Sequence, residues 1–184
     1  TGLPMPHAKT WGRLVANGRA EAGRLGLAAQ PHAIVGTVPV QHAYGFESTF
    51  LQALHGGSSF WSGKPFYPLD IVAALAAVPR PRLLVTTPFH LKTLLLSGVE
   101  LPAVDLLLCA TAPLTPQLAA LAEQKMGGPL IEIYGCTEAG QLASRRTTQG
   151  QRWTTLGEVR ITQRDDESFI AHGEGDCADN RDEC

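Results

Sequence analysis

The chain has 184 residues, of which 44% are hydrophobic and 17% are charged, and its formal net charge is -2. This length can bury the core of one domain, and the near-neutral charge excludes the basic surface that binding to nucleic acid requires. No uninterrupted apolar run approaches the ~20 residues of a membrane span, and no basic-then-apolar signal opens the chain. We therefore expect a soluble protein with no nucleic-acid partner and no membrane span.

The four cysteines, Cys109, Cys136, Cys177 and Cys184, are widely spaced. They form no close pair of the kind that binds zinc, and their number is far below that of a disulfide scaffold. Reduced thiols fit this pattern best. We therefore expect a cytoplasmic location.

Helical and strand patterns alternate along most of the chain. Helical patterns occupy residues 8–27, 44–57, 68–78, 88–98 and 115–128, and short apolar runs occupy 33–40, 58–61, 82–87, 104–110 and 129–135. Apolar strands separated by helices of about ten or more residues indicate a mostly parallel sheet covered on both faces. The predicted fold class is α/β.

The pattern changes near residue 143, where shorter, polar-alternating segments typical of antiparallel strands begin. From Gln163 to Cys184 the chain holds eight acidic and two basic residues, a composition typical of a disordered end or an interaction tail. We divide the chain into an α/β subdomain at 1–142, a β-rich extension at 143–162 and an acidic tail at 163–184.

Three loops with polar or small residues follow predicted strands: "PVQHAYG" at 39–45, "CATAPLT" at 109–115 and "YGCTEAG" at 134–140. In an open parallel sheet, ligands bind beyond the carboxyl ends of the strands. We therefore expect all three loops to open onto one edge of the sheet and to form a ligand site there.

The third loop carries the most varied chemistry. The ring of Tyr134 could stack on a base, and Gly135 allows a sharp bend of the backbone beside a ligand. The hydroxyl of Thr137 could donate to a phosphate oxygen, and the carboxylate of Glu138 is a hard ligand suited to Mg²⁺. A plain turn with a helix-capping threonine is the alternative interpretation.

The other two loops are less specific. Ala110, Thr111 and Ala112 would let a flat ligand approach the backbone, but they also read as the start of a helix. A lone histidine such as His42 is more often a hydrogen-bonded structural residue than a functional one. The remaining histidines have no partners in their spacing and receive no role: His7, His32, His55, His90 and His172.

Taken in order, these motifs resemble the adenylate-forming superfamily, which includes acyl-CoA and aryl-CoA ligases, peptide-synthetase adenylation domains and firefly luciferase. Thr1, Gly2 and Pro4 match the end of its phosphate loop. "VPVQHAYGF" resembles the segment that borders the acyl pocket, "LLLCATAPL" resembles the turn beside adenine, and "YGCTE" matches the most diagnostic pentapeptide. The match runs from Thr1 to about Arg160, so we expect a central piece of a longer AMP-binding N-terminal domain.

The resemblance implies a role for each matching residue. Tyr134 would stack on adenine, Thr137 would meet the phosphate or the acyl carboxylate, and Glu138 would hold Mg²⁺. His42 would border the acyl pocket, and with Thr137 and Glu138 it makes up the expected catalytic set. The other residues assigned to nucleotide binding are Thr1, Gly2, Ala110, Thr111, Ala112, Gly135 and Cys136.

The chain also departs from the family pattern. Met5 stands where the phosphate-loop lysine usually lies, and Pro6 replaces a glycine. Lys9 is the nearby candidate substitute, with an exposed lysine at the start of a helix as the alternative. Asp176 lies in a degenerate version of the ribose-binding Thr-Gly-Asp motif.

The resemblance implies an AMP-forming ligase that activates a fatty or aryl acid with MgATP and transfers it to coenzyme A, or to the phosphopantetheine of an acyl carrier protein. The family's C-terminal domain and its activating lysine are not in this chain, so we expect the fragment alone to be inactive. A non-catalytic nucleotide- or acyl-binding module is one alternative. An amino-acid adenylation domain is the other, although no aspartate for a substrate ammonium lies within residues 42–46.

Overall fold

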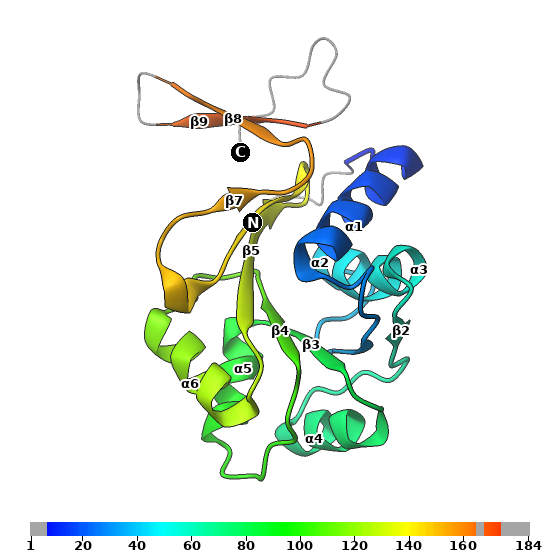
Figure 1. Cartoon of the computed structure of the whole chain (residues 1–184), viewed down its shortest axis with the longest axis vertical. Helices are drawn as coiled ribbons and strands as arrows, with labels where there is room; N and C mark the ends of the chain where they lie inside the picture. The colour runs from blue at the N-terminus through cyan, green and yellow to red at the C-terminus, as the bar shows by residue number, and fades with distance from the viewer. Residues whose placement is uncertain (1–6, 165–167, 174–184) are drawn as a thin grey trace.

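The computed structural model describes residues 7–164 and 168–173, and its main element is a seven-stranded sheet in the order β2-β1-β3-β4-β5-β6-β7 (Figure 1). The strands are β1 (Ala33–Gly36), β2 (Ser59–Phe60), β3 (Arg82–Thr86), β4 (Leu106–Cys109), β5 (Leu130–Cys136), β6 (Gly140–Arg145) and β7 (Thr154–Thr155). Neighbouring strands from β2 through β5 are parallel, and β6 and β7 are antiparallel to their neighbours. The predicted α/β class with a mostly parallel sheet is confirmed.

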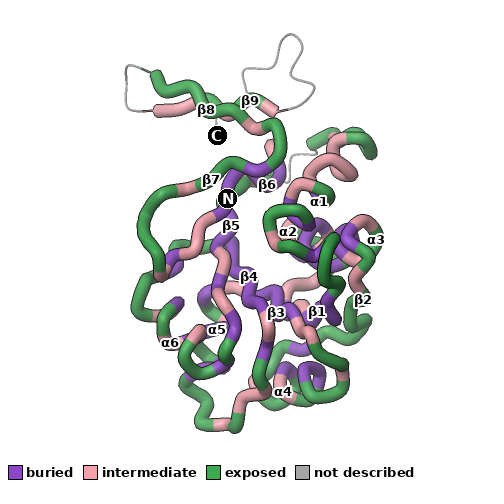
Figure 2. Tube along the Cα trace, in the orientation of Figure 1, coloured by how far each residue is buried: buried purple, intermediate pink, exposed green. Residues whose placement is uncertain are grey.

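Helices cover both faces of this sheet. They are α1 (Trp11–Leu25), α2 (Ala43–Gly45), α3 (Gln52–Gly56), α4 (Pro68–Ala77), α5 (Pro88–Leu96) and α6 (Pro116–Met126). Successive side chains of a strand point to opposite faces, so Leu84 packs in the core under α4, α5 and α6, whereas Leu83 and Val85 pack in the core under α1. The buried trace runs through the central strands (Figure 2).

The predicted helix at 44–57 is divided into three pieces. A π-helical segment (Phe46–Leu51) lies between α2 and α3, and α3 ends before the left-handed Gly57. The hydroxyl of Thr49 donates to the carbonyl of Gly45 at 2.5 Å, a local bond that competes with regular helical pairing. The π-helical segment places Glu47 and Ser48 toward the centre of the molecule, where both side chains are buried.

A short 3₁₀ turn (Thr147–Gln149) connects β6 to β7. After β7 the chain forms a separate antiparallel pair, β8 (Arg160–Gln163) and β9 (Phe169–His172), which lies at the opposite end of the molecule from α4 (Figure 1). This confirms the predicted antiparallel segment near the C-terminus. The boundary expected after residue 142 falls inside β6, which pairs with β5 in the main sheet. The division into three parts stays a prediction, and residues 165–167 and 174–184 of the expected tail lie outside the described residues.

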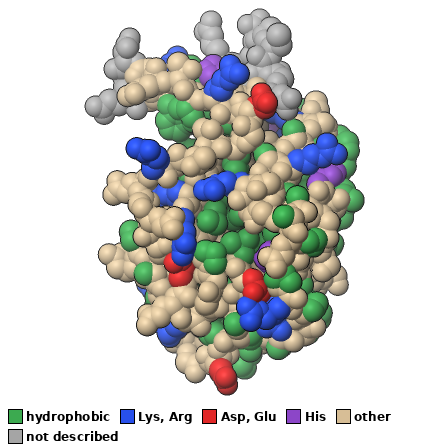
Figure 3. All heavy atoms as spheres, viewed as in Figure 1, with side chains coloured by type: hydrophobic (Ala, Val, Ile, Leu, Met, Phe, Trp, Pro, Cys, Tyr) green, Lys and Arg blue, Asp and Glu red, His purple; other side chains and the backbone are tan. Residues whose placement is uncertain are grey.

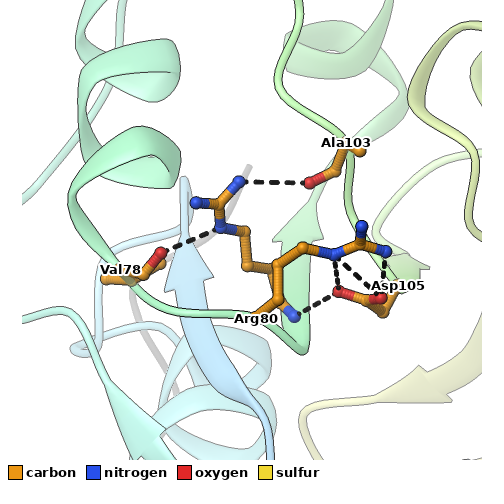
Figure 4. A network of polar contacts seen from close by, with 5 residues as sticks. Val78, Arg80, Ala103 and Asp105 are labelled. Carbon is orange, nitrogen blue, oxygen red and sulfur yellow. Dashed lines mark hydrogen bonds and ion pairs between the residues drawn. The ribbon is translucent and has the colours of Figure 1, made fainter.

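At the amino ends of β3 and β4, charged side chains and backbone groups bond to one another (Figure 4). Asp105 accepts hydrogen bonds from the guanidinium of Arg80 and, at 2.7 Å, from the backbone amide of Arg82. Arg82 in turn donates to the carbonyls of Val78 and Ala103. Pairing with Arg80 lowers the pKa of Asp105.

On the face drawn in Figure 3, the coloured Lys and Arg side chains form separate groups rather than one continuous basic surface. Among the described residues, no helix is both long enough and apolar enough to cross a membrane.

Candidate active site

A cavity of about 540 Å³ opens at the carboxyl ends of β1, β3, β4 and β5. Its wall includes residues of the loop after β1, residues 110 and 111 after β4, and residues 135–137 of the β5–β6 turn. The three loops singled out in the sequence therefore meet at one edge of the sheet. The β3–α5 junction also contributes Thr87 and His90, which the sequence did not indicate.

The predicted site residues fall into three groups. The cavity is lined by His42, Ala110, Thr111, Gly135, Cys136 and Thr137. Outside its lining lie Lys9, Ala112, Tyr134 and Glu138. Outside the described residues lie Thr1, Gly2 and Asp176. The roles assigned to all of these residues stay predictions.

The β5–β6 turn is built around two glycines. A Cβ atom on Gly135 would lie 2.2 Å from the carbonyl oxygen of Gly140, so only glycine fits there. Gly140 has φ of 80°, and a Cβ atom on it would meet the side-chain amide of Asn17 at 2.5 Å. This tight turn brings Thr137 to the cavity wall.

Glu138 lies beside this wall with 40% of its side chain exposed, and its Oε1 is 3.3 Å from Nε2 of His7. A hydrogen bond from its own backbone amide, followed by one from Cys136, lowers the pKa of Glu138. The charges of His7 and Lys9 act in the same direction. His7, which received no role from the sequence, is therefore a direct neighbour of the predicted metal ligand.

An ionised, accessible carboxylate fits the way proteins hold Mg²⁺, which keeps several waters and takes one or two carboxylates together with substrate phosphates. The described residues contain no cluster of three or more His, Cys, Asp or Glu side chains able to hold a metal. Glu138 therefore suits a magnesium ion that arrives with substrate phosphates.

Lys9 is paired within the site. Its Nζ lies 2.7 Å from Oε1 of Glu47, and the two side chains are 16% and 4% exposed. Glu47 lies on the π-helical segment and lines the cavity. The sequence missed Glu47 because regular helical spacing gave no sign of the π-helical turn.

A buried carboxyl group lies directly behind the cavity. Glu21 on α1 is fully buried and accepts hydrogen bonds from Ser48, Gln52 and Gln141, of which Gln141 also lines the cavity. Burial raises the pKa of Glu21 to about 7. The periodicity of α1 places Glu21 next to Ala22 on the buried side, a signal that the sequence analysis passed over.

A second polar chain reaches the cavity from β1 and β3. The hydroxyl of Thr37 lies 3.0 Å from that of Thr86 and 2.9 Å from Nδ1 of His90. Tyr44 donates its phenolic hydroxyl to the carbonyl of Thr86 at 3.2 Å. Burial lowers the pKa of His90, which keeps its ring neutral.

Thr111 stands out in the cavity wall because its φ is 81°. A β-branched residue is strained in this left-handed region. Such strain persists where the surrounding structure enforces it, and it concentrates at ligand sites. The backbone at the end of β4 is therefore held in a special conformation beside the cavity.

Tyr134 belongs to a cluster of aromatic side chains next to the cavity. Its ring is 41% exposed and contacts the rings of Trp153 and Phe169 at centroid distances of 5.7 and 6.3 Å. The guanidinium of Arg145 lies 4.3 Å from the centre of the Trp153 ring. The exposed part of the Tyr134 ring is available to a planar ligand.

A protein-family model described as "AMP-binding enzyme" matches residues 1–172. The search of curated proteins gave no match. Solved structures that share the fold include ATP-bound MatB from Rhodopseudomonas palustris, which is 19% identical with a TM-score of 0.69. That alignment covers 88% of this chain and 33% of MatB.

Two further structures show the same fold. The o-succinylbenzoate CoA synthetase from Bacillus subtilis, in complex with its acyl-adenylate intermediate, is 19% identical with a TM-score of 0.76 over 92% of this chain and 36% of that enzyme. A benzoate CoA ligase from Burkholderia xenovorans is 16% identical with a TM-score of 0.72 over 89% and 35%. The chain thus spans about a third of the length of these structures.

Proposed function

Because the chain belongs to the family of AMP-binding enzymes, we propose that the full-length protein is an ATP-dependent ligase that joins a fatty or aryl acid to a thiol. A carboxylate oxygen of the acid attacks the α-phosphorus of ATP, and the bond from that phosphorus to the departing oxygen breaks, releasing pyrophosphate. A thiolate then attacks the acyl carbon of the acyl-adenylate, and AMP leaves. The thiol belongs to coenzyme A or to the phosphopantetheine of a carrier protein.

The observation that carries this proposal is the β5–β6 turn, which places Thr137 on the cavity wall and Glu138 beside it with an ionised carboxylate. Thr137 donates its hydroxyl to the α-phosphate or to the acyl carboxylate. Glu138 holds Mg²⁺ that accompanies ATP, and a bound magnesium ion supplies charge neutralisation on the phosphates. Preorganised groups of this kind lower the barrier by matching charge that develops during transfer.

The remaining site residues orient the two substrates. Tyr134 stacks on adenine, and the backbone at Ala110, Thr111 and Ala112 flanks the base, with Gly135 and Cys136 on the strand below. Lys9 contacts the phosphates, and His42 borders the acyl group. The match to the family's motifs assigns Thr1 and Gly2 to the phosphates and Asp176 to the ribose, and these three residues lie outside the described part of the chain.

The acid proposed is fatty or aryl because the cavity offers apolar wall at Val38, Pro39 and Ile133. The carboxylate of Glu47 also lines the cavity, and such a group could meet the ammonium of an amino acid. However, Glu47 is already paired with Lys9 at 2.7 Å, so its charge is matched within the protein. This pairing disfavours an amino-acid substrate. Two of the solved structures that share this fold are an o-succinylbenzoate CoA synthetase and a benzoate CoA ligase, which supports an aryl acid as the substrate.

The test is carboxylate-dependent ATP–pyrophosphate exchange by the full-length protein, against a panel of fatty, aryl and amino acids. Exchange with a fatty or aryl acid supports the proposal, and a second assay with coenzyme A or a carrier protein then identifies the thiol. Exchange with amino acids alone would indicate a carrier-loading adenylation domain. ATP binding without exchange for any acid would indicate a binding module and overturn the proposed ligase activity.

A further inference from the structure

His90 is held at the cavity wall by a chain of two hydroxyl groups. It lies in the first turn of α5, directly after β3, and its Nδ1 is 2.9 Å from the hydroxyl of Thr37. That hydroxyl is in turn 3.0 Å from the hydroxyl of Thr86, which is 1% exposed. The ring is therefore fixed through Nδ1, and because Nε2 makes no hydrogen bond to any described residue, it is the nitrogen left for a ligand.

The direction of each hydrogen bond in the series Thr86–Thr37–His90 follows from the number of protons available. Among the described residues, the hydroxyl of Thr86 has Thr37 as its hydrogen-bond partner and no other. A buried hydroxyl that donates to nothing is costly, so Thr86 donates to Thr37. The single proton of Thr37 then goes to Nδ1 of His90. Because Nδ1 accepts, the neutral ring carries its proton on Nε2 and presents a hydrogen-bond donor.

The surroundings of His90 suit the far end of an acyl group. The ring of Phe66 meets that of His90 edge-on at 5.0 Å, and Phe89 lies 5.7 Å away. In the sheet, β3 lies two strands from β5, which carries Thr137 just after its end. With strands about 4.8 Å apart, His90 lies roughly 10 Å across the sheet from the end where the carboxylate would react.

We propose that His90 donates a hydrogen bond from Nε2 to an oxygen atom at the end of the acid opposite its carboxylate, so that the protein selects hydroxyl- or carbonyl-bearing acids. The proposal rests on the ligase function proposed above. Thr37 acts as a positioning residue, because its hydroxyl fixes the ring and determines which nitrogen carries the proton. The selectivity thus comes from a residue to which the sequence gave no role.

The experiment measures ATP–pyrophosphate exchange by the full-length protein with matched acids: 4-hydroxybenzoate against benzoate, and 4-hydroxycinnamate against cinnamate. We expect kcat/KM to favour the hydroxylated member of at least one pair by about tenfold or more, the effect of one buried hydrogen bond whose loss leaves a donor unpaired. His90→Leu should remove this preference mainly through KM for the hydroxylated acid. His90→Gln, which keeps a donor, should restore part of it.

Two control variants separate recognition from folding. Thr37→Val removes the hydroxyl at nearly constant shape and should reduce the preference, whereas Thr37→Ser keeps the hydroxyl and should retain it. His172→Leu changes an exposed histidine on β9 and should leave the preference unchanged. Equal kcat/KM for both members of each pair in the wild-type protein, or a preference that survives His90→Leu, would overturn the proposal.

Direct measurement of acid binding distinguishes a failure of the proposed ligase function from a failure of the proposed role of His90. If no acid supports exchange, the shift in Tm caused by each acid with ATP present still reports selection. A larger shift with the hydroxylated acids that disappears in His90→Leu would support His90 as the selecting residue in a binding module. Equal shifts, or none, would overturn its role together with the ligase proposal.

Discussion

The two ends of the parallel strands treat polar side chains differently. At the amino ends, Asp105 accepts from both Arg80 and the backbone of Arg82, so the charged groups satisfy one another (Figure 4). At the carboxyl ends, Thr137 and His90 line an open cavity and the carboxylate of Glu138 is 40% exposed beside it. Polar groups that are satisfied internally hold strands together, whereas groups left open to the cavity can recognise a ligand.

Two buried carboxyl groups, Glu132 and Glu21, differ in the side chains that donate hydrogen bonds to them. Glu132, which is also buried, accepts from the guanidinium of Arg145 at 2.7 Å and braces β5 against β6. Glu21 accepts from the neutral side chains of Ser48, Gln52 and Gln141, and burial raises its pKa to about 7. Burial without a cationic partner favours the neutral form of a carboxyl group, as at Glu21.

The largest effect is expected from Glu138→Gln at the carboxyl ends. Loss of one charge-stabilising group should reduce kcat for pyrophosphate exchange by about 10²–10³-fold. The matched control is Glu100→Gln, since Glu100 is also exposed but lies between α5 and β4, at the amino end of β4 and away from the β5–β6 turn. Near wild-type exchange by the Glu138 variant would mean that the carboxylate in the β5–β6 turn has no catalytic role.

The second prediction concerns pH and Glu21. In the folded protein its pKa rises from 4.5 to about 7, so between these values the folded state holds a proton that the unfolded state has lost. The stability of the wild type should therefore fall, relative to Glu21→Gln, as pH rises from about 4.5 to 7. At about 1.4 kcal/mol per pKa unit the difference is on the order of 3 kcal/mol.

This difference is measured by urea unfolding of both proteins across that pH range. The glutamine variant is the appropriate comparison because it stays neutral and keeps an oxygen that can accept from Ser48. Parallel stability curves for the two proteins would show that Glu21 is ionised throughout, and that the polar network behind the cavity stabilises its charge.

At the amino ends, Asp105→Ala should lower the free energy of unfolding by about 1–3 kcal/mol, because the backbone amide of Arg82 loses its charged acceptor, whereas the exposed guanidinium of Arg80 regains water. Asp105→Asn should cost less. The pKa of Asp105 is lowered by Arg80, so the advantage of aspartate is present at neutral pH and is lost as pH falls below about 4. Pyrophosphate exchange by the folded variants should be unchanged, and a large loss would show that the two ends are coupled.

Tyr134→Ala tests the aromatic side of the site. If the ring stacks on adenine, its removal should weaken ATP binding by about 1–3 kcal/mol, and Tyr134→Phe should retain most of the affinity. Titration calorimetry with ATP measures both. Trp153→Ala is a useful third variant because the ring of Trp153 contacts that of Tyr134 at a centroid distance of 5.7 Å. Unchanged ATP affinity in all three would assign these rings to packing alone.

The smallest effect is expected at Thr111. Relief of its left-handed strain in Thr111→Gly should raise the free energy of unfolding by about 1 kcal/mol, less the entropy that glycine adds to the unfolded chain. Urea unfolding measures the change, with Thr93→Gly in the interior of α5 as the contrasting variant that should destabilise. A destabilised Thr111→Gly would mean that the threonine side chain contributes more than its strain costs.

Much of the architecture is local and could be predicted. The order of helices and strands follows from apolar periodicity, and helix ends follow from residues such as Thr10, Thr87 and Thr115, whose hydroxyls accept from backbone amides at the starts of α1, α5 and α6. Because parallel strands share one carboxyl edge, their loops also had to meet. The sequence therefore indicated where the cavity lies and which six of its lining residues belong to the three loops.

What tertiary structure alone decided are contacts between distant residues. Glu21 and Gln141 are 120 positions apart, Thr37 and His90 are 53 apart, and Lys9 and Glu47 are 38 apart. No periodicity records which side chains will face one another across such distances, since that depends on how helices pack on the sheet and on the π-helical segment Phe46–Leu51. The sequence by itself determined the scaffold and the place of the site, whereas packing determined which polar groups are paired, protonated or open to a ligand.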